Sequence, residues 1–231
     1  MRKKILVSWS SGKDSAWALH VLRQRDDIEV VGLLTTLNQH FDRVAMHGVR
    51  RALVQRQAEA AGLPLWEAPL PWPCSNQEYE QVMAGVCAKA IENGITAVAF
   101  GDLFLEDVRK YREDQMKRAG LEPLFPIWGR NTRELLEKML AAGLRARIVC
   151  LDPSKVPAEF AGRELSFRCM KELPAGVDPC GENGEFHTFV YDGPMFACPI
   201  TIESGETVTR DGFVYADVFP TGTALQTSVA K

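Results

Sequence analysis

The sequence lacks the residue patterns that mark several common classes of protein. None of its six cysteines forms a CxxC pair, and their spacing is wide and uneven, so we expect no disulfide framework. Its four histidines lack the spacing of zinc ligands. No stretch approaches the roughly 20 apolar residues of a membrane span, and the apolar run near the N-terminus is too short for a signal-peptide core. We therefore expect a cytoplasmic protein with no membrane partner.

Charge of one sign is also lacking. The chain has 27 lysines and arginines against 30 aspartates and glutamates, which gives a formal net charge of -3. Because nucleic acids are bound through an excess of basic residues, a nucleic-acid partner is not expected. The basic residues of segment 109–118 are interleaved with acids and indicate a solvated helix face.

Apolar residues make up 46% of the 231 residues, enough for one large α/β domain or for such a domain with a small appendage. Apolar strands alternate with helices up to residue 152. The predicted strands cover 5–7, 29–36, 65–68, 97–100 and 147–151, and the predicted helices cover 16–22, 50–61, 77–93, 106–119 and 132–142. This alternation predicts an α/β fold with a doubly wound, mainly parallel sheet over residues 1–152. A smaller C-terminal α+β portion, residues 153–231, is expected to bind substrate.

The segment between the first predicted strand and the first helix carries the strongest chemical signal. Its residues are Ser10, Ser11, Gly12, Lys13, Asp14 and Ser15. Ligands of open α/β sheets bind at the carboxyl ends of the strands, and the free N–H groups of a helix N-terminus suit a phosphate. Gly12 allows a close approach to the anion, Lys13 adds a cation, and Asp14 could hold Mg²⁺ or cap the helix. An ordinary serine-rich helix cap is the alternative.

This segment resembles the PP-loop, SGGxDS, of the N-type ATP pyrophosphatases, also called the adenine nucleotide alpha hydrolase-like superfamily. The resemblance implies that the loop holds the β,γ-pyrophosphate of ATP. It also implies transfer of AMP to a carboxylate or carbonyl with release of pyrophosphate. Ser11 stands where the motif has its first glycine.

Further segments resemble the diphthine–ammonia ligase family from about Lys4 to Phe196. They are Trp9, HGVR at 47–50, FGDL at 100–103, YRED at 111–114, FPIWG at 125–129 and CGENGEFHT at 180–188. The resemblance implies an ATP- and Mg²⁺-dependent carbon–nitrogen ligase that adenylates a carboxylate and lets ammonia displace AMP. The implied partners are ammonium and an acceptor, either protein-bound diphthine or, in bacterial relatives, a small molecule such as a corrinoid acid. Asn183 and Phe186 depart from the glycine and tyrosine of the diphthamide members.

Particular residues receive roles from these patterns. The nucleotide site is predicted at the six loop residues and at the strand ends Thr35, Thr36, Gly101 and Asp102, with Asp14 on Mg²⁺. The alternatives are a plain strand end for Thr35 and Thr36 and a helix cap for Asp102. The predicted catalytic residues are Lys13, Asp14, Glu182, Glu185 and His187, and the predicted substrate-binding residues are His47, Arg50, Arg112, Glu113, Glu182 and Glu185. A turn with solvent-facing acids is the alternative for residues 182–187.

Two other functions stay open at this point. A PP-loop tRNA thiolase would need a persulfide cysteine or an iron–sulfur site and a basic surface, against which the missing CxxC pairs and the net charge speak. A nucleotide sensor would use the same fold to bind ATP or AMP without turnover. A homodimer is also expected as an assembly.

Overall fold

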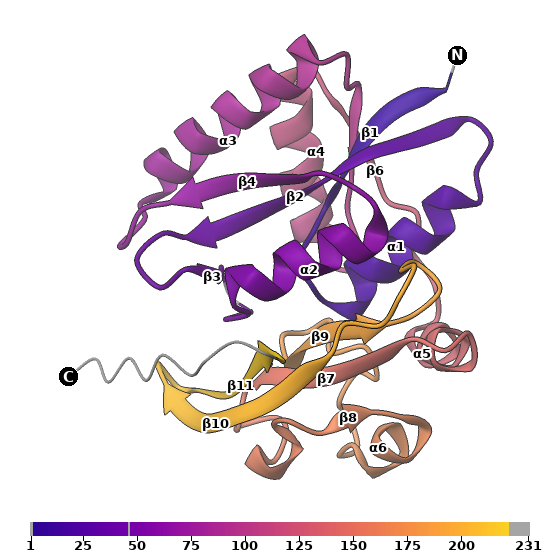
Figure 1. Cartoon of the computed structure of the whole chain (residues 1–231), viewed down its shortest axis with the longest axis vertical. Helices are drawn as coiled ribbons and strands as arrows, with labels where there is room; N and C mark the ends of the chain where they lie inside the picture. Colours follow the sequence, from indigo (N-terminus) through magenta and orange to yellow (C-terminus); the bar gives the residue numbers. More distant parts are fainter. Residues whose placement is uncertain (1, 46, 222–231) are drawn as a thin grey trace.

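A computed structural model describes residues 2–45 and 47–221 of the protein (Figure 1). The chain forms two β-sheets. The first is built from β1 to β6 and the second from β7 to β11. The first sheet and its helices lie above the second in Figure 1. Across the described residues, we find no helix with both the length and the apolar character of a membrane span.

The first sheet is parallel apart from one short strand. Its strands are β1 (Lys3–Ser8), β2 (Ile28–Asn38), β3 (Arg43–Val44), β4 (Leu65–Leu70), β5 (Ala97–Ala99) and β6 (Glu122–Leu124). The parallel strands lie in the order β4-β2-β1-β5-β6, and β3 pairs antiparallel with the end of β2. Ile5, Leu6 and Val7 of β1 are fully buried, as expected of a central strand covered on both faces.

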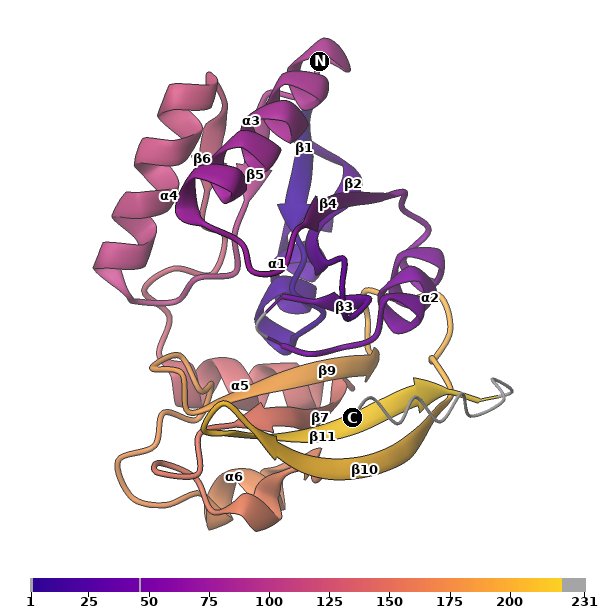
Figure 2. The ribbon, with the colours of Figure 1, turned by 90° about the vertical axis from the view of Figure 1, so that its left-hand side faces the viewer.

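Helices cover both faces of this sheet. They are α1 (Lys13–Arg23) and α2 (Arg51–Ala61) on one face and α3 (Asn76–Glu92) and α4 (Glu106–Ala119) on the other (Figure 2). The alternation of β1 side chains requires this: Ile5 and Val7 share a core with α1 and α2, whereas Leu6 packs with Ala90 of α3 in a separate cluster. The prediction of a doubly wound α/β fold is therefore confirmed.

The second sheet is antiparallel and has β7 near its middle. The elements of this half are α5 (Thr132–Ala141), β7 (Arg145–Leu151), η1 (Ala158–Phe160), β8 (Glu164–Leu165), α6 (Phe167–Glu172), β9 (Phe186–Asp192), β10 (Ile202–Arg210) and β11 (Phe213–Pro220). β7 pairs with β8, β9 and β11, and β10 pairs with β11. Asp211 and Gly212 have φ values of 51° and 84°, which is the backbone of a tight two-residue hairpin between β10 and β11.

One predicted strand exists but lies in a different sheet from the one expected. The run 147–151 was expected to be the last strand of the parallel sheet, but it belongs to β7 of the antiparallel sheet. Its continuous apolar run has a different origin, because β7 is an inner strand whose last four residues, Ile148–Leu151, are buried. The two sheets divide between β6 and β7, while the domain division at residue 152 stays a prediction.

A buried glutamine joins the two halves. Gln57 of α2 is completely buried and accepts a hydrogen bond from Trp9 Nε1 at 2.8 Å. Its own amide donates to the carbonyls of Ser11 at 3.0 Å and of Val190 at 2.6 Å. One side chain therefore connects the end of β1, the following loop and β9.

We predict that Gln57→Leu lowers the free energy of unfolding by about 2 to 4 kcal/mol, since buried polar groups lose their partners. Urea denaturation would measure the change. The matched control is Gln55→Leu on the same helix, where the exposed side chain makes one long contact of 3.4 Å with Glu67 and a change within about 0.5 kcal/mol is expected. Equal effects of the two substitutions would contradict the structural role of Gln57.

Candidate active site

The serine–glycine loop leads directly into α1. Gly12 is the N-cap residue, with φ −89° and ψ 172°, so neither Ser10 nor Asp14 is the cap. Ser10 Oγ lies 3.2 Å from Ser15 Oγ. Ser15 Oγ also donates a hydrogen bond to the Gly12 carbonyl at 3.0 Å. The backbone N–H of Lys13 donates to Thr188 Oγ1 of β9 at 3.1 Å. The second sheet therefore contributes to the start of the first helix.

Ser11 has a backbone conformation that favours glycine. Its φ is 71°, in the left-handed region where a Cβ atom is strained. The residue is fully buried, and its Oγ has no hydrogen-bond partner among the residues that the structure describes. The conformation is fixed from outside, because the Ser11 carbonyl accepts hydrogen bonds from Gln57 and from the N–H of Val190.

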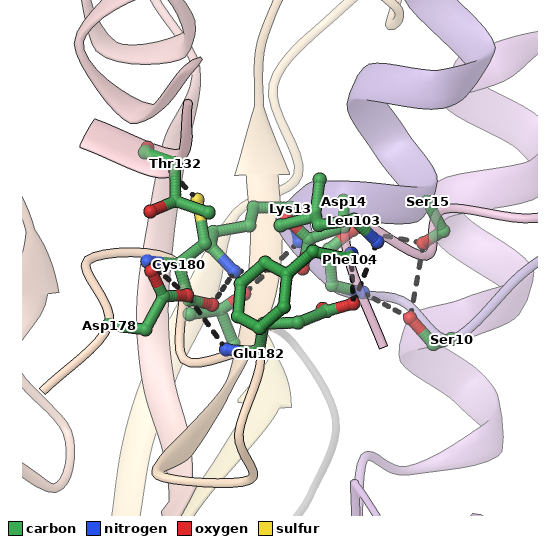
Figure 3. Close-up of polar contacts among 12 residues, drawn as sticks. Ser10, Lys13, Asp14, Ser15, Leu103, Phe104, Thr132, Asp178, Cys180 and Glu182 are labelled. Carbon is green, nitrogen blue, oxygen red and sulfur yellow. Dashed lines mark hydrogen bonds and ion pairs between the residues drawn. The ribbon is translucent and has the colours of Figure 1, made fainter. Parts of the chain in front are cut away.

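Lys13 links the loop to the C-terminal half. Its side chain is only 2% exposed, and Nζ lies 2.8 Å from Asp14 Oδ2. Nζ also donates to the carbonyl of Cys180 (Figure 3). Burial alone lowers the pKa of Lys13, but Asp14, the Cys180 thiol and Glu182 outweigh it and the net pKa is raised. Lys13 therefore stays charged and holds the segment around Cys180 against α1.

Two aspartates next to the loop have free carboxylate oxygens. Within residues 2–45 and 47–221, Asp14 Oδ1 and Asp102 Oδ2 are buried without a hydrogen-bond partner. Burial raises the pKa of both carboxyls. Gly101, which precedes Asp102, packs closely against the backbone of Asp14: a Cβ on Gly101 would lie only 2.8 Å from the carbonyl carbon of Asp14. The end of β5 therefore touches the start of α1, and only glycine fits there.

These oxygens fit Mg²⁺, which is commonly bound by one or two carboxylates together with substrate phosphates. In the described part of the chain, no group of three acids, histidines or cysteines forms a metal site by itself.

A second loop brings Glu182 to the same place. Glu182 Oε1 accepts a hydrogen bond from the N–H of Leu103 at 2.7 Å (Figure 3). Asp178 Oδ2 shapes this loop by accepting from the N–H groups of Cys180 at 3.2 Å and Glu182 at 3.0 Å. Burial raises the pKa of Glu182 to about 7, the Leu103 hydrogen bond opposes this, and Asp14 adds to it. Glu182 therefore titrates near neutral pH.

Glu185 serves a different neighbourhood. Its side chain is 3% exposed, and Oε1 accepts from the Asp178 N–H at 3.0 Å and from Asn183 Nδ2 at 3.2 Å. Its Oε2 is buried with no partner in the described structure. The alternative of solvent-facing acids is therefore wrong for Glu185.

Two histidines from the two halves stack on each other. The rings of His47 and His187 lie 4.3 Å apart at 24°. Burial and Lys13 lower the pKa of His187 to about 4. Burial, His187 and Lys13 lower the pKa of His47 well below its usual value. Both rings are therefore neutral at neutral pH.

A cavity of about 840 Å³ opens beside the loop. Of the residues predicted from the sequence, it is lined by Ser10, Thr36, His47 and Arg112. Thr35 is buried, and its Oγ1 finds no partner within the described residues. A volume of this size is within the usual range for small-molecule sites, about 300 to 1,000 Å³.

Arg50 and Glu113, which were predicted to bind substrate, each take part in an ion pair. Arg50 Nε donates to Asp217 Oδ1 of β11 at 3.1 Å, and Arg43 joins the same oxygen at 2.9 Å. Glu113 accepts from Arg109 Nε at 2.7 Å on α4. The structure therefore gives Arg50 a role between the two halves and gives Glu113 a role along its own helix.

The family model for the diphthamide synthase N-terminal domain matches residues 3–123, and that for the C-terminal domain of the same enzyme matches residues 131–218. The chain belongs to the diphthamide synthase family. Curated relatives named diphthine–ammonia ligase are 26% identical in Bos taurus, over 94% of this chain and 89% of that protein, and 26% identical in Homo sapiens over the same shares. The relative of that name in Danio rerio is 30% identical over 70% of this chain and 69% of that protein.

Some site residues of this diphthamide synthase family member were missed from the sequence. Asp178 has a recognisable signal, since an aspartate before a turn often accepts from backbone N–H groups that follow it. Thr188 lies in the segment 180–188 that carries the family resemblance, but nothing local predicts its contact with Lys13, 175 positions away, or that of Gln57 with Ser11, 46 positions away.

We predict that the free energy of unfolding is about 0.5 to 1 kcal/mol higher for Ser11→Gly than for Ser11→Ala. Glycine relieves the left-handed strain but loses more backbone entropy on folding. Both variants lack the hydroxyl, so the comparison isolates the backbone. Thermal and urea denaturation of the two proteins would measure it, and a more stable alanine variant would contradict the strain at this position.

Proposed function

We propose that the protein is an ATP-dependent amide ligase, which adenylates a carboxylate and lets ammonia displace AMP, with pyrophosphate as the other product. Membership of the diphthamide synthase family supports this proposal. The observation that carries it is the meeting of the PP-loop with the loop of Glu182, joined by the contacts of Lys13 with Cys180 and of Glu182 with Leu103. A phosphate-binding loop and a carboxylate that titrates near neutral pH are thereby held together.

The chemistry needs both parts. A carboxylate does not react with ammonia directly, because oxide is a very poor leaving group. Attack of its oxygen on the α-phosphorus of ATP releases pyrophosphate and makes AMP the leaving group. The helix N-terminus, Ser10 and Ser15 would hold the phosphates, and Asp14 and Asp102 would hold Mg²⁺ through the oxygens that accept no hydrogen bond. When bound, Mg²⁺ screens the negative charge of the phosphates.

Glu182 also suits the second substrate. At neutral pH ammonia is mostly present as ammonium, which is attracted to the carboxylate of Glu182. An ammonium ion must lose a proton before its nitrogen can attack the adenylate carbonyl. Glu182, with its pKa near 7, is the group that we assign to accept this proton. The nitrogen then forms the amide bond as the bond to AMP breaks, with loss of a second proton.

The acceptor carries the carboxylate. The relatives are named diphthine–ammonia ligase. Protein-bound diphthine is therefore one acceptor that we propose to test. A small carboxylic acid, such as a corrinoid acid, is the other. The cytoplasmic location and the homodimer stay predictions.

The cysteines give little support to a thiolase. Burial raises the pKa of Cys150 to about 11, and it also raises the pKa values of Cys169 and Cys180. A buried thiol of raised pKa is a poor nucleophile, since the thiolate is the reactive form.

We predict acceptor-dependent release of pyrophosphate and AMP from ATP, Mg²⁺ and ammonium, with a loss of about 100-fold or more in Asp14→Ala and Ser15→Ala, since aligning and charge-screening groups contribute this much. A panel with diphthine-bearing elongation factor and corrinoid acids would be assayed. Asp107→Ala is the matched control, since Asp107 is an exposed acid in the first turn of α4. ATP binding without turnover on any acceptor would favour the nucleotide sensor.

A pH profile tests the role of Glu182. The carboxylate accepts a proton only when it is deprotonated, so kcat at saturating substrates should rise about tenfold per pH unit below the pKa that Glu182 has in the loaded enzyme and level off above it. In Glu182→Gln this rise should disappear, while it should persist in Glu206→Gln, whose side chain is exposed on β10. An unchanged profile in Glu182→Gln would exclude Glu182 as the base.

A further inference from the structure

The cavity beside the PP-loop continues into a groove between α3 and α4. Its inner end is lined by Ser10 and Thr36 at the carboxyl ends of β1 and β2, and its outer part is lined by the facing sides of the two helices. The helices lie side by side on the same face of the first sheet (Figure 2). The groove therefore extends away from the phosphate loop, to the side opposite α1 and α2.

The outer part of the groove is mainly apolar. Val98 and Phe100 of the protein core lie beneath it, and its accessible wall includes Met83, Ala88 and Ile91 of α3. Methionine side chains adapt their shape to an irregular ligand. Such a surface favours a ligand with an apolar body, because its burial removes apolar area from water.

One charged side chain lies at the junction between this groove and the loop. The Arg112 guanidinium stands over the Phe100 ring, 5.0 Å from its centroid. Its Nε is buried and lacks a hydrogen-bond partner among the residues that the structure describes. Asp102 Oδ2 lies 3.7 Å from Nε and forms an ion pair with it, beyond hydrogen-bond distance. The Arg112 side chain is 30% exposed, and a guanidinium with donors left over is suited to a carboxylate.

The junction is also next to the reaction centre. Asp102 follows Gly101, and Gly101 packs against the backbone of Asp14 and Ser15. A carboxylate on Arg112 would therefore lie beside the carboxylates and the helix N-terminus to which we assign ATP and Mg²⁺.

We propose that the groove between α3 and α4 is the acceptor subsite, and that it takes a small organic carboxylic acid with a slim apolar body and its carboxylate on Arg112. This inference rests on the proposed function for its meaning, since the bound carboxylate is the group that ATP would activate. It favours a small molecule over a protein-borne carboxylate as the acceptor.

The binding can be tested without ATP and without turnover. The full chain would be titrated with straight-chain monocarboxylates from propanoate to octanoate, and with 1-hexanol as the uncharged partner of hexanoate, followed by NMR. The affinity should rise about fourfold per added methylene over the first members. Hexanoate should bind about tenfold or more tightly than 1-hexanol, because of the charged hydrogen bond.

Two variant pairs locate the site. Arg112→Gln should remove the preference for hexanoate over 1-hexanol. Arg109→Gln should keep it, since Arg109, on the same helix, also stands over aromatic rings, those of Phe125 and Trp128, but is not one of the lining residues. Ala88→Trp should abolish binding by filling the groove, and Gln81→Trp, at an exposed position of α3 that is not among the lining residues, should not.

Several results would overturn the inference. They are equal affinities for hexanoate and 1-hexanol, an Arg112→Gln variant that binds hexanoate as the wild type does, and a groove that is covered by a second copy of the chain. Because these measurements need no pyrophosphate release, an inactive protein that binds hexanoate through Arg112 would contradict the proposed function and leave the subsite in place.

Discussion

The buried ammonium of Lys13 is the interaction on which the arrangement of the site depends. It lies between the carboxylate of Asp14 on α1 and the carbonyl of Cys180 in the other half. A buried charge is tolerated only when it is paired and hydrogen-bonded, so both partners must stay in position. The Cys180 carbonyl in turn fixes the loop that carries Glu182. The position of the acidic loop is therefore coupled to the residue that begins the first helix.

The same coupling recurs in neutral hydrogen bonds around the loop. The start of α1 uses Thr188 of β9, while the Ser11 carbonyl binds the Val190 N–H of the same strand. Gln57 closes the arrangement from α2. Because buried networks of this kind are costly to leave partly satisfied, the second sheet cannot shift without disturbing the PP-loop. A left-handed Ser11 is held in place by this surrounding structure.

The sequence was sufficient for the features that depend on local pattern. The loop at Ser10 to Ser15, the mainly parallel sheet and the strand end at Gly101 follow from apolar periodicity and from the geometry of strand–helix units. The pairing of Arg50 with Asp217 could not be predicted, since it joins residues 167 positions apart. The position of β7 was misjudged for a related reason: an inner antiparallel strand and a parallel strand give the same apolar run.

The site has more buried carboxylate oxygens than the protein's own donors satisfy. Asp14 and Asp102 each have a buried oxygen with no hydrogen-bond partner in the described residues, whereas Lys13 is already shared between two acceptors. Unpartnered buried carboxylate oxygens raise the free energy of the folded protein. A bound cation lowers it, and whatever binds only the folded state stabilises that state. The arrangement of acids that a divalent cation and ammonium would need is thus one that the protein alone cannot fully satisfy.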